Sequence, residues 1–473
     1  MPEPENLQQQ NVADAYLVAV RQQIRWKKAQ APVLRELENH ITDQKNAFLS
    51  QGLDEETATA RAVAEMGDPV TAGQQLDRNH RPQPDWQLLV LTAVLLLLGL
   101  FFQFLMGPDL YDGREVFFRQ LLWAGLSVLA MLAAYFLDFT IMAKYPKLFF
   151  GALSVLTAVY YLGAGHSYFR MGTIYLLMFF PTAFAGLVYG MRNQGYKGLM
   201  LCGAALLIPV WFAWLLPRIT VLLLLGVSFL VILTAALVKG WFNVRKPIAL
   251  FLIYITTITA VLAIPLGLIP AGVYAERSLE VILNPELIQV MINPALDPSG
   301  FGYMGTLLRQ HLLHSRFIGQ GLPLGDYSGA LLPAANTDFV LTYLTYHCGW
   351  LVMLAVLALF FAFMVRAFLL CRRQKSVLGF LVSLAVILTL AVQCLTYILA
   401  NFGILLFAPL SLPLLSYGGR GLLTNMFLIG FLLSVFRTGN LVKDETVPAA
   451  VKISRFIEYE NGRVIINLKT HTS

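Results

Sequence analysis

The residues best suited to chemistry lie in a glycine-punctuated stretch, Asn293-Pro-Ala-Leu-Asp297-Pro-Ser-Gly-Phe-Gly-Tyr303. Asp297 is the carboxylate of this stretch, and it lies in a long polar loop of a chain that is otherwise rich in apolar runs. A carboxylate in such a loop can accept a proton from a bound hydroxyl group, and Gly300 and Gly302 let other groups approach the backbone closely. An aspartate before proline is also a common helix N-cap. The sequence leaves these two roles of Asp297 equally open.

Other polar residues of the same loop have simpler explanations. Asp338 precedes an apolar run, and we expect it to cap the helix that this run forms. His311 and His314 are three residues apart on one face of a predicted helix. No third ligand accompanies them, so we expect the polar face of an interfacial helix and predict no metal site. Glu286 falls in the first turn of a predicted short helix, where the helix dipole favours an acid.

The rest of the chain has the composition of a membrane protein. Of its 473 residues 57% are hydrophobic and 13% are charged, and the mean hydropathy of +0.66 excludes a soluble domain for most of the chain. Apolar runs of about 20 residues recur, and each is long enough to cross a bilayer as a helix. We predict ten spans, at 86–106, 117–138, 148–163, 172–190, 198–216, 219–238, 247–269, 349–369, 378–399 and 420–438.

The charges of the short loops predict the orientation of these spans. Lysine and arginine gather in alternate loops, at 144–147, 192–197, 239–246 and 366–375. The positive-inside rule therefore places both termini in the cytoplasm and the loops 270–337 and 407–419 outside. This asymmetry explains most of the net charge of +7, so the charge does not call for a nucleic-acid partner.

Two parts of the chain lie outside the spans. Residues 1–85 predict a small cytosolic helical domain, in which Asp54 caps one helix and Asp68-Pro69 begins another. Residues 86–438 form the predicted membrane domain. Residues 439–473 predict a cytosolic tail, in which strands at 450–459 and 463–469 flank the hairpin turn Asn461-Gly462.

Five pieces of sequence resemble, in order, motifs of the SEDS family of bacterial membrane proteins, which includes FtsW, RodA and SpoVE. Residues 293–303 are similar to the family's Asn-Pro-x-x-Asp-Pro-x-Gly-x-Gly-Tyr loop, and residues 332–339 to its Leu-Pro-Glu-x-His-Thr-Asp-Phe. Residues 412–419 resemble its Leu-Pro-x-x-Ser-Tyr-Gly-Gly. Shorter matches are Gly319-Gln-Gly321 and Asn401-Phe-Gly403. The resemblance covers about 85–438.

The resemblance implies an all-α polytopic membrane protein with about ten transmembrane helices in the bacterial cytoplasmic membrane. It implies polymerisation of lipid II, the lipid-linked precursor of peptidoglycan, at the outer leaflet beside a class B penicillin-binding protein, in elongation, division or sporulation. The family's essential loop aspartate falls on Asp297, which would act as general base on the acceptor hydroxyl while undecaprenyl diphosphate leaves. A cofactor is unknown, with a divalent cation as the candidate.

We expect the leaving diphosphate to bind at residues 416–420, where glycine amides and a cation meet at a helix start. Arg420 is disfavoured at the positive end of a helix and outside the membrane, and a bound anion would offset both costs. The alternative is that Arg420 snorkels to lipid headgroups. The predicted substrate-binding residues are Tyr303, Arg309, Arg316, Asp338, Asn401, Ser416, Tyr417, Gly418, Gly419 and Arg420.

The chain departs from the family's pattern at several positions. Ala334 and Asn336 stand where the family has Glu and His, Ala183 where it has Glu, and Arg218 where it has Asp. This loss of polar groups favours an alternative function, a catalytically inactive scaffold for a penicillin-binding protein. A flippase or transporter of lipid-linked precursor is a further alternative, and the scarcity of charge within the spans argues against it.

Overall fold

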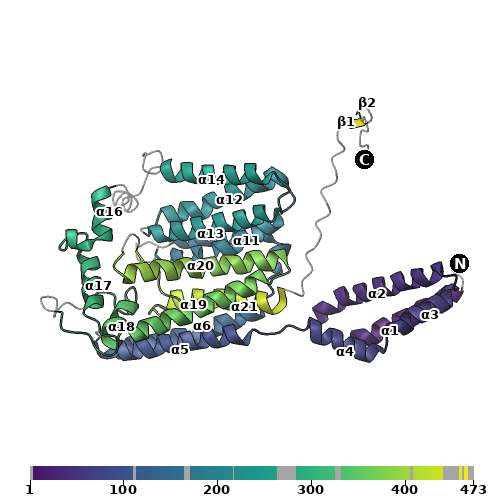
Figure 1. Cartoon of the computed structure of the whole chain (residues 1–473), viewed down its shortest axis with the longest axis horizontal. Coiled ribbons are helices and arrows are strands. Elements are labelled where there is room, and N and C mark those ends of the chain that lie inside the picture. The colour runs from purple at the N-terminus through teal and green to yellow at the C-terminus, as the bar shows by residue number, and fades with distance from the viewer. Residues whose placement is uncertain are drawn as a thin grey trace. The chain divides into compact units, whose positions relative to one another are not determined.

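The protein is almost wholly helical over the residues that its computed structural model describes. These are residues 4–109, 113–163, 171–216, 218–263, 284–324, 332–404, 408–439, 457–460 and 463–466. Contacts divide the chain into two compact units, Met1–Pro84 and Asp85–Ser473 (Figure 1). This division lies one residue from the boundary that the sequence predicts.

The first unit is a small helical domain with its own core. Its helices are α1 (Pro4–Gln23), α2 (Lys27–Ser50), α3 (Glu55–Glu65) and α4 (Pro69–His80). Asp54 accepts a hydrogen bond from the Thr57 amide at 3.0 Å, and Asp68 accepts one from the Thr71 amide at 2.8 Å. Both predicted caps are therefore confirmed, because each depends on residues only three positions away. The core consists of Tyr16, Val20, Ile24, Ala29, Val33, Ile41 and Ala62.

The second unit holds the long apolar helices. They are α5 (Trp86–Met106), α6 (Gly113–Phe136), α8 (Pro146–Gly163), α10 (Thr173–Leu177) with α11 (Phe180–Gly190), α12 (Gly195–Trp214), α13 (Ile219–Val238), α14 (Lys246–Ala263), α19 (Trp350–Arg372), α20 (Val377–Asn401) and α21 (Gly419–Thr438). Among the described residues nine candidate membrane spans are long and apolar enough to cross a bilayer, and α14 contributes a shorter apolar stretch, Lys246–Thr259. The predicted spans agree with these helices; the last residues of the seventh span and Pro217 lie outside the described residues.

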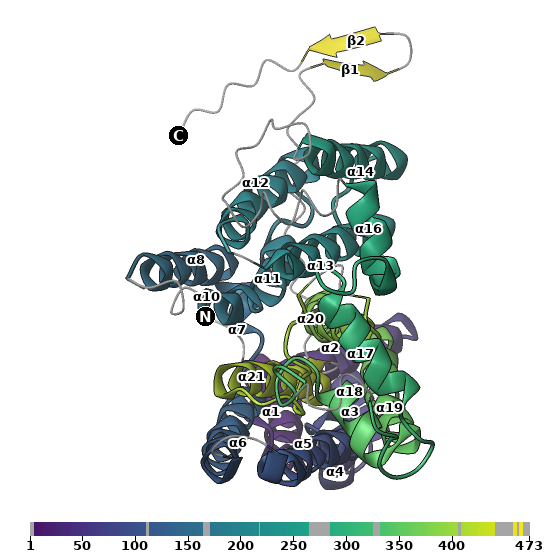
Figure 2. The same ribbon diagram turned by 90° about the vertical axis from the view of Figure 1, so that its left-hand side faces the viewer.

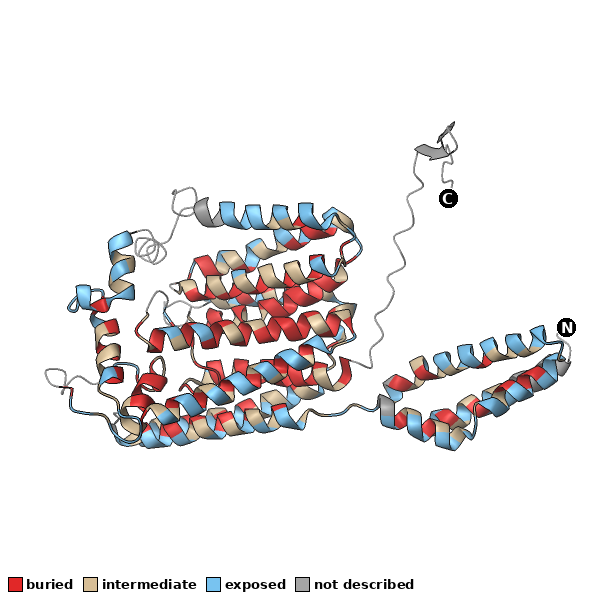
Figure 3. Cartoon of the chain, in the orientation of Figure 1, coloured by how far each residue is buried: buried red, intermediate tan, exposed pale blue. Residues whose placement is uncertain are grey.

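The helices differ in how far the protein itself covers them. The pair α10–α11, α20 and α21 are mostly buried, whereas α6 and α8 bury less than a fifth of their length. Figure 3 shows α20 as a largely buried helix in the middle of the unit and α5 and α14 with exposed outer faces. Because α6 and α8 are apolar and uncovered, these two helices face lipid or a membrane partner.

Several short elements complete the chain. They are η1 (Gly107–Asp109), α7 (Ile141–Lys144), α16 (Pro285–Ile292), η2 (Pro294–Leu296), α17 (Tyr303–Leu313), α18 (Val340–Cys348), β1 (Ile457–Glu460) and β2 (Arg463–Ile466). Figure 2 shows α16 and α17 across the end of the helical unit. The two strands pair antiparallel, with Ile457 opposite Ile466. The other residues of the predicted strands and the predicted turn Asn461-Gly462 lie outside the described residues.

Helices α6 and α21 pack closely, with the backbone of one helix against the backbone of the other. Gly430 of α21 lies against the carbonyl group of Met131, so an added Cβ would collide with that oxygen. Four residues further along α21, Ser434 donates a hydrogen bond to the carbonyl oxygen of Leu137 at 2.6 Å. A small residue and a hydroxyl group thus join two membrane helices, as is common where lipid provides no hydrophobic driving force.

We predict that Gly430→Ala lowers the free energy of unfolding by about 1–3 kcal/mol, because α6 and α21 must move apart. Thermal unfolding of the detergent-purified protein measures this change. Gly125→Ala is the matched control, since Gly125 lies on α6 with no neighbouring atom within 4 Å of an added Cβ. Equal unfolding temperatures for the two variants would contradict the close packing.

Candidate functional site

Asp297 follows the 3-10 turn η2, and its carboxylate caps the next turn of the chain. Its Oδ1 atom accepts a hydrogen bond from the Gly300 amide at 3.0 Å, and its Oδ2 atom accepts one from the Phe301 amide at 2.8 Å. No helix begins at Pro298, so the helix-cap role is wrong: Asp297 caps a turn of its own loop. Each carboxylate oxygen keeps further lone pairs. Asp297 therefore presents an oriented, half-exposed carboxylate that can still accept a proton.

The two glycines after Asp297 make this turn possible. A Cβ at Gly300 would collide with the carboxylate of Asp297, and a Cβ at Gly302 would collide with the carbonyl oxygen of Pro294. The close backbone approach that the sequence predicts here is confirmed. The approaching group is the chain's own turn, so both glycines act by shaping the position of Asp297.

Helix α17 attaches this turn to the end of α20. Gly305 lies on the ring of Pro294, and an added Cβ would be 2.6 Å from the Pro294 Cγ atom. Gly403, just after α20, lies against Arg309, with 3.0 Å between an added Cβ and the Arg309 Cγ atom. Arg309 also donates from Nη2 to the carbonyl oxygen of Ile292 at 2.5 Å. Arg309, predicted to bind substrate, thus links α16, α17 and the end of α20.

Two other predicted substrate-binding residues flank α17 and stay accessible. Tyr303 begins the helix and is 43% exposed. Arg316 follows the helix, and its side chain is exposed while its carbonyl oxygen accepts from the Trp350 amide at 3.0 Å. Their positions are compatible with substrate contact, which stays a prediction.

Asn401, at the end of α20, is the buried anchor of the segment that carries Asp338. Its Oδ1 atom accepts from the amide and the hydroxyl group of Thr342, each at 3.0 Å. Its Nδ2 atom donates to the carbonyl oxygens of Asp338 at 3.0 Å and Tyr397 at 2.9 Å. The side chain is fully buried. All its hydrogen-bonding groups thus have partners inside the protein, and the predicted substrate-binding role of Asn401 stays a prediction.

Tyr397, one helical turn before Asn401, holds the same segment from the same face of α20. Its hydroxyl group donates to the carbonyl oxygen of Thr337 at 3.0 Å and accepts from the Val340 amide at 2.9 Å. The sequence analysis missed Tyr397, although its spacing of four residues from Asn401 places both side chains on one face of a helix.

A second group of bonds reaches the segment at Asn336. The carbonyl oxygen of Asn336 accepts from Gln103 Nε2 of α5 at 3.2 Å and from the Tyr417 amide at 2.8 Å. Gln103 Nε2 also donates to the carbonyl oxygen of Leu415 at 3.3 Å. The structure thus brings Asp338, Asn401 and the loop 412–418 together. The predicted role of the Tyr417 side chain, which is half-buried, stays a prediction.

Asp338 does not cap α18. That helix begins after Phe339 without a side-chain cap, and the amide of Asp338 donates to the carbonyl oxygen of Ala334, whose φ is +52°. The expected capping role of Asp338 is therefore wrong. Burial raises the pKa of the Asp338 carboxyl group, and the positive charge of Arg218 partly opposes this rise.

Arg218 is held in place by the loop before α21. Its Nη1 atom donates to the carbonyl oxygen of Pro409 at 2.7 Å, and Thr220 donates to the carbonyl oxygen of Ala408. The sequence identified Arg218 as an external arginine where the family has an acid. In the structure the positive charge of this guanidinium group lowers the pKa of the Asp338 carboxyl group.

The predicted diphosphate site at 416–420 is largely occupied by the protein's own contacts. The buried hydroxyl group of Ser416 accepts from the Leu412 amide at 3.0 Å, and the Gly418 amide donates to Gln120 Oε1 at 3.3 Å. A Cβ at Gly419 would collide with the ring of Trp123. The Ser416 hydroxyl and the Gly418 amide therefore have partners within the protein and Gly419 is needed for packing, while the diphosphate-binding role of these residues stays a prediction.

Arg420 is the member of this site that stays exposed. Its Nη1 atom would lie 2.8 Å from a Cβ added at Gly172, and the hydroxyl group of Tyr160 lies over the same glycine. Arg420 and Tyr160 thus come from distant parts of the sequence to one place. The sequence analysis missed Tyr160, since nothing in the local pattern of α8 distinguishes it.

Each histidine of α17 is oriented by a carbonyl group of its own helix. The Nδ1 atoms of His311 and His314 lie 2.8 and 2.9 Å from the carbonyl oxygens of Leu307 and Gln310, one turn earlier in the helix. In the part of the chain that the structure describes, no three His, Cys, Asp or Glu side chains come close enough to hold a metal ion.

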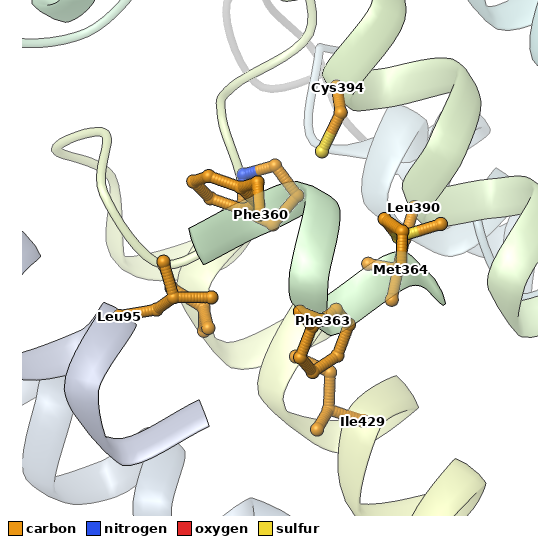
Figure 4. A pocket seen from close by; sticks show the side chains of 9 residues that line it. Leu95, Phe360, Phe363, Met364, Leu390, Cys394 and Ile429 are labelled. Atoms are coloured by element: carbon orange, nitrogen blue, oxygen red, sulfur yellow. The ribbon is translucent and has the colours of Figure 1, made fainter. Parts of the chain in front are cut away.

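An apolar pocket lies between α5, α19, α20 and α21, next to the loop 412–418 (Figure 4). It is lined by Leu95, Phe360, Phe363, Met364, Leu390, Cys394, Pro413, Leu414 and Ile429. The lining contains no ionisable oxygen or nitrogen side chain, so this pocket cannot orient a sugar or a diphosphate. The candidate site is therefore the surface around Asp297, Asp338 and Arg420.

Comparison with known proteins supports the resemblance of the sequence motifs. Residues 86–440, about three quarters of the chain, match the model of the FtsW/RodA/SpoVE family of cell cycle proteins. The chain belongs to this family. The matched range begins and ends within two residues of the helices α5 and α21.

Two curated FtsW relatives match part of the chain. A protein of Trichlorobacter lovleyi named probable peptidoglycan glycosyltransferase FtsW is 29% identical over 148 residues, 31% of this chain and 39% of that protein. One of Alteromonas naphthalenivorans with the same name is 32% identical over 175 residues, 36% of this chain and 34% of that protein. The matched region spans about two fifths or less of the length of these relatives.

The fold is also similar to that of a chain in a solved structure. A chain from work described as "Structural coordination of polymerization and crosslinking by a peptidoglycan synthase complex" aligns with a TM-score of 0.56 and 18% identity. The alignment covers 76% of this chain and 99% of that one. The protein is thus an all-α, multi-pass membrane protein.

We predict that Asp338→Asn makes the protein more stable at neutral pH. Because burial raises the folded-state pKa of this carboxyl group above its ordinary value of 3.8, folding favours the protonated form. The free energy of unfolding then falls as the pH rises from that ordinary value through the raised one. Asp338→Asn removes this pH dependence of the free energy of unfolding. Arg218→Gln removes the charge that opposes the rise in pKa, so the free energy of unfolding continues to fall to higher pH.

Thermal unfolding in detergent between about pH 4 and pH 8 measures both effects. Glu286→Gln is the matched control, because Glu286 is an exposed carboxylate of the same external segment. A neutral-pH stability of Asp338→Asn at or below that of the wild type contradicts the prediction.

Proposed function

We propose that the chain polymerises lipid II into glycan strands of peptidoglycan at the outer leaflet of the bacterial cytoplasmic membrane. The observation that carries this proposal is the carboxylate of Asp297, oriented by two backbone amides in the motif loop of the family. The names of the relatives, probable peptidoglycan glycosyltransferases, support the same activity.

In the proposed reaction Asp297 needs a suitable orientation and a free lone pair. The 4-hydroxyl oxygen of the acceptor sugar attacks the anomeric carbon of the donor, and the bond from that carbon to the diphosphate oxygen breaks. The electron pair of this bond leaves with undecaprenyl diphosphate. The proton of the attacking hydroxyl group passes to the Asp297 carboxylate, which acts as general base.

The orientation and the partners are part of the proposal. The cationic loops support cytoplasmic termini, which put Asp297, Asp338 and Arg420 on the outer side. A class B penicillin-binding protein is the proposed partner, supported by the similarity to a chain of a peptidoglycan synthase complex. The uncovered apolar faces of α6 and α8 offer surface for such a partner within the membrane.

We predict that Asp297→Ala and Asp297→Asn lower the rate of glycan polymerisation by about 100-fold or more, since a positioned general base contributes this much. The assay uses the purified full chain, lipid II and the partner protein in vesicles. Glu286→Gln, an exposed acid of the same segment, is the control and should keep the wild-type rate.

The possible outcomes separate the function classes. Polymer from the wild type and not from the Asp297 variants supports the enzyme. Polymer at equal rates from all three removes Asp297 as the base. If the wild type forms no polymer with the partner supplied, the protein is a scaffold or a transporter, as the lost polar groups at Ala183 and Ala334 favour.

We also propose that Arg420 binds the diphosphate of the lipid. It is exposed at the first turn of α21, where helix amides and a guanidinium group both attract an anion, and Tyr160 lies beside it. Ser416 and Gly418 contribute by shaping the loop and do not contact the ligand in this proposal.

We predict that Arg420→Ser weakens binding of undecaprenyl diphosphate by about tenfold, the effect of losing one charge-assisted hydrogen bond. Binding to the detergent-purified protein is measured against undecaprenol, which lacks the diphosphate. Arg316→Ser, at another exposed external arginine, is the control. If Arg420 instead snorkels to headgroups, its replacement leaves the diphosphate affinity unchanged.

A further inference from the structure

One long stretch of the membrane unit carries cations and no acid. Between Asp138 and Glu276 the sequence contains nine lysines and arginines and no aspartate or glutamate. Seven of the nine lie in three loops, which we call the cationic loop surface: residues 144–147, 191–197 and 239–246. Such a concentration of positive charge attracts anions.

The structure locks the three loops together. Gly190, at the end of α11, lies on Pro146, with 2.6 Å between an added Cβ and the Pro146 Cγ atom. The Asn193 amide donates to the carbonyl oxygen of Trp241 at 2.9 Å, and Asn243 Nδ2 donates to Asn193 Oδ1 at 3.2 Å. The cations therefore lie on one preassembled surface and cannot separate to reduce their mutual repulsion.

Residues beside these cations place the surface at the depth of lipid headgroups. Tyr145 and Tyr196 are 48% and 40% exposed, and tyrosine is enriched at the membrane–water interface. Leu148 and Ile248 are exposed apolar residues within two positions of Lys147 and Lys246. Each lysine thus stands where the lipid-facing surface of a helix ends.

The cations fall into two groups by their contacts. Lys239 lies over the ring of Phe380 at 3.6 Å, Lys246 donates to the carbonyl oxygen of Val238 at 2.8 Å, and Arg192 is buried over a tyrosine ring. These three, and Lys144, which lies over the ring of Tyr145 at 5.1 Å, help to build the surface. Lys147, Lys197 and Arg245 are exposed, one from each of the three loops.

We propose that the cationic loop surface binds the headgroups of anionic phospholipids. A phosphodiester at the membrane surface supplies negative charge at the depth where the cations lie, and basic surfaces between membrane helices bind such headgroups. The proposal concerns a lipid that stays bound to the protein, and it does not depend on the proposed glycosyltransferase activity.

The test measures lipid binding to the full chain purified in a zwitterionic detergent. We expect phosphatidylglycerol to raise the unfolding temperature, phosphatidylcholine with the same acyl chains to have no such effect, and added salt to weaken the first. The triple variant Lys147→Gln, Lys197→Gln, Arg245→Gln should weaken phosphatidylglycerol affinity on the order of 100-fold, since each surface cation contributes about tenfold or less.

A second triple variant is the control: Arg372→Gln, Arg373→Gln, Lys375→Gln. It removes the same charge from the single loop between α19 and α20 and should keep most of the affinity. Equal losses in both variants would show diffuse attraction without a site. An equal response to phosphatidylcholine, or to inorganic phosphate alone, would also overturn the proposal. None of these outcomes bears on polymerisation, so they are distinguishable from a failure of the proposed function.

Discussion

The buried side-chain amide of Asn401 is the interaction on which the segment that carries Asp338 depends. Between residues 336 and 342 the chain turns from a loop into α18, and its backbone groups need partners that a loop cannot supply from within. Asn401 and Tyr397 provide them from one face of α20, and Gln103 adds a bond from α5. Because the protein interior excludes water, each hydrogen bond there is strong, and each polar group without a partner costs free energy. The position of Asp338 follows from this network.

Asp297 is placed by a different physical constraint, the exclusion of side chains from its turn. Gly300 and Gly302 let the backbone close around the carboxylate, while Gly305 and Gly403 bring α17 onto the end of α20. Asp297 is thus positioned by backbone contacts. Asp338 lies in a segment held by buried side chains, and its carboxyl group carries a desolvation cost that Arg218 partly offsets. The two carboxylates therefore have different environments.

Charged side chains of the membrane unit form separate groups. Arg218 acts on the half-buried Asp338, and Arg420 stands exposed at the start of α21. Three other loops hold lysines and arginines on one surface. Cationic side chains of a membrane protein attract anionic lipid headgroups, so the surrounding lipid contributes to the electrostatic potential at these loops.

The sequence by itself determined the spans, the helix caps of residues 54 and 68, and the turn glycines around Asp297. These features depend on runs of apolar residues or on partners within a few positions. The motifs also determined the family. Only the tertiary structure decided which polar residues turn inward: Asn401 bonds Thr342, Gly418 bonds Gln120, and Gly419 carries Trp123. The partners of these residues lie about 60 to 300 positions away in the chain. No local pattern distinguishes a polar side chain that has its hydrogen-bond partner within the protein from one that binds a ligand.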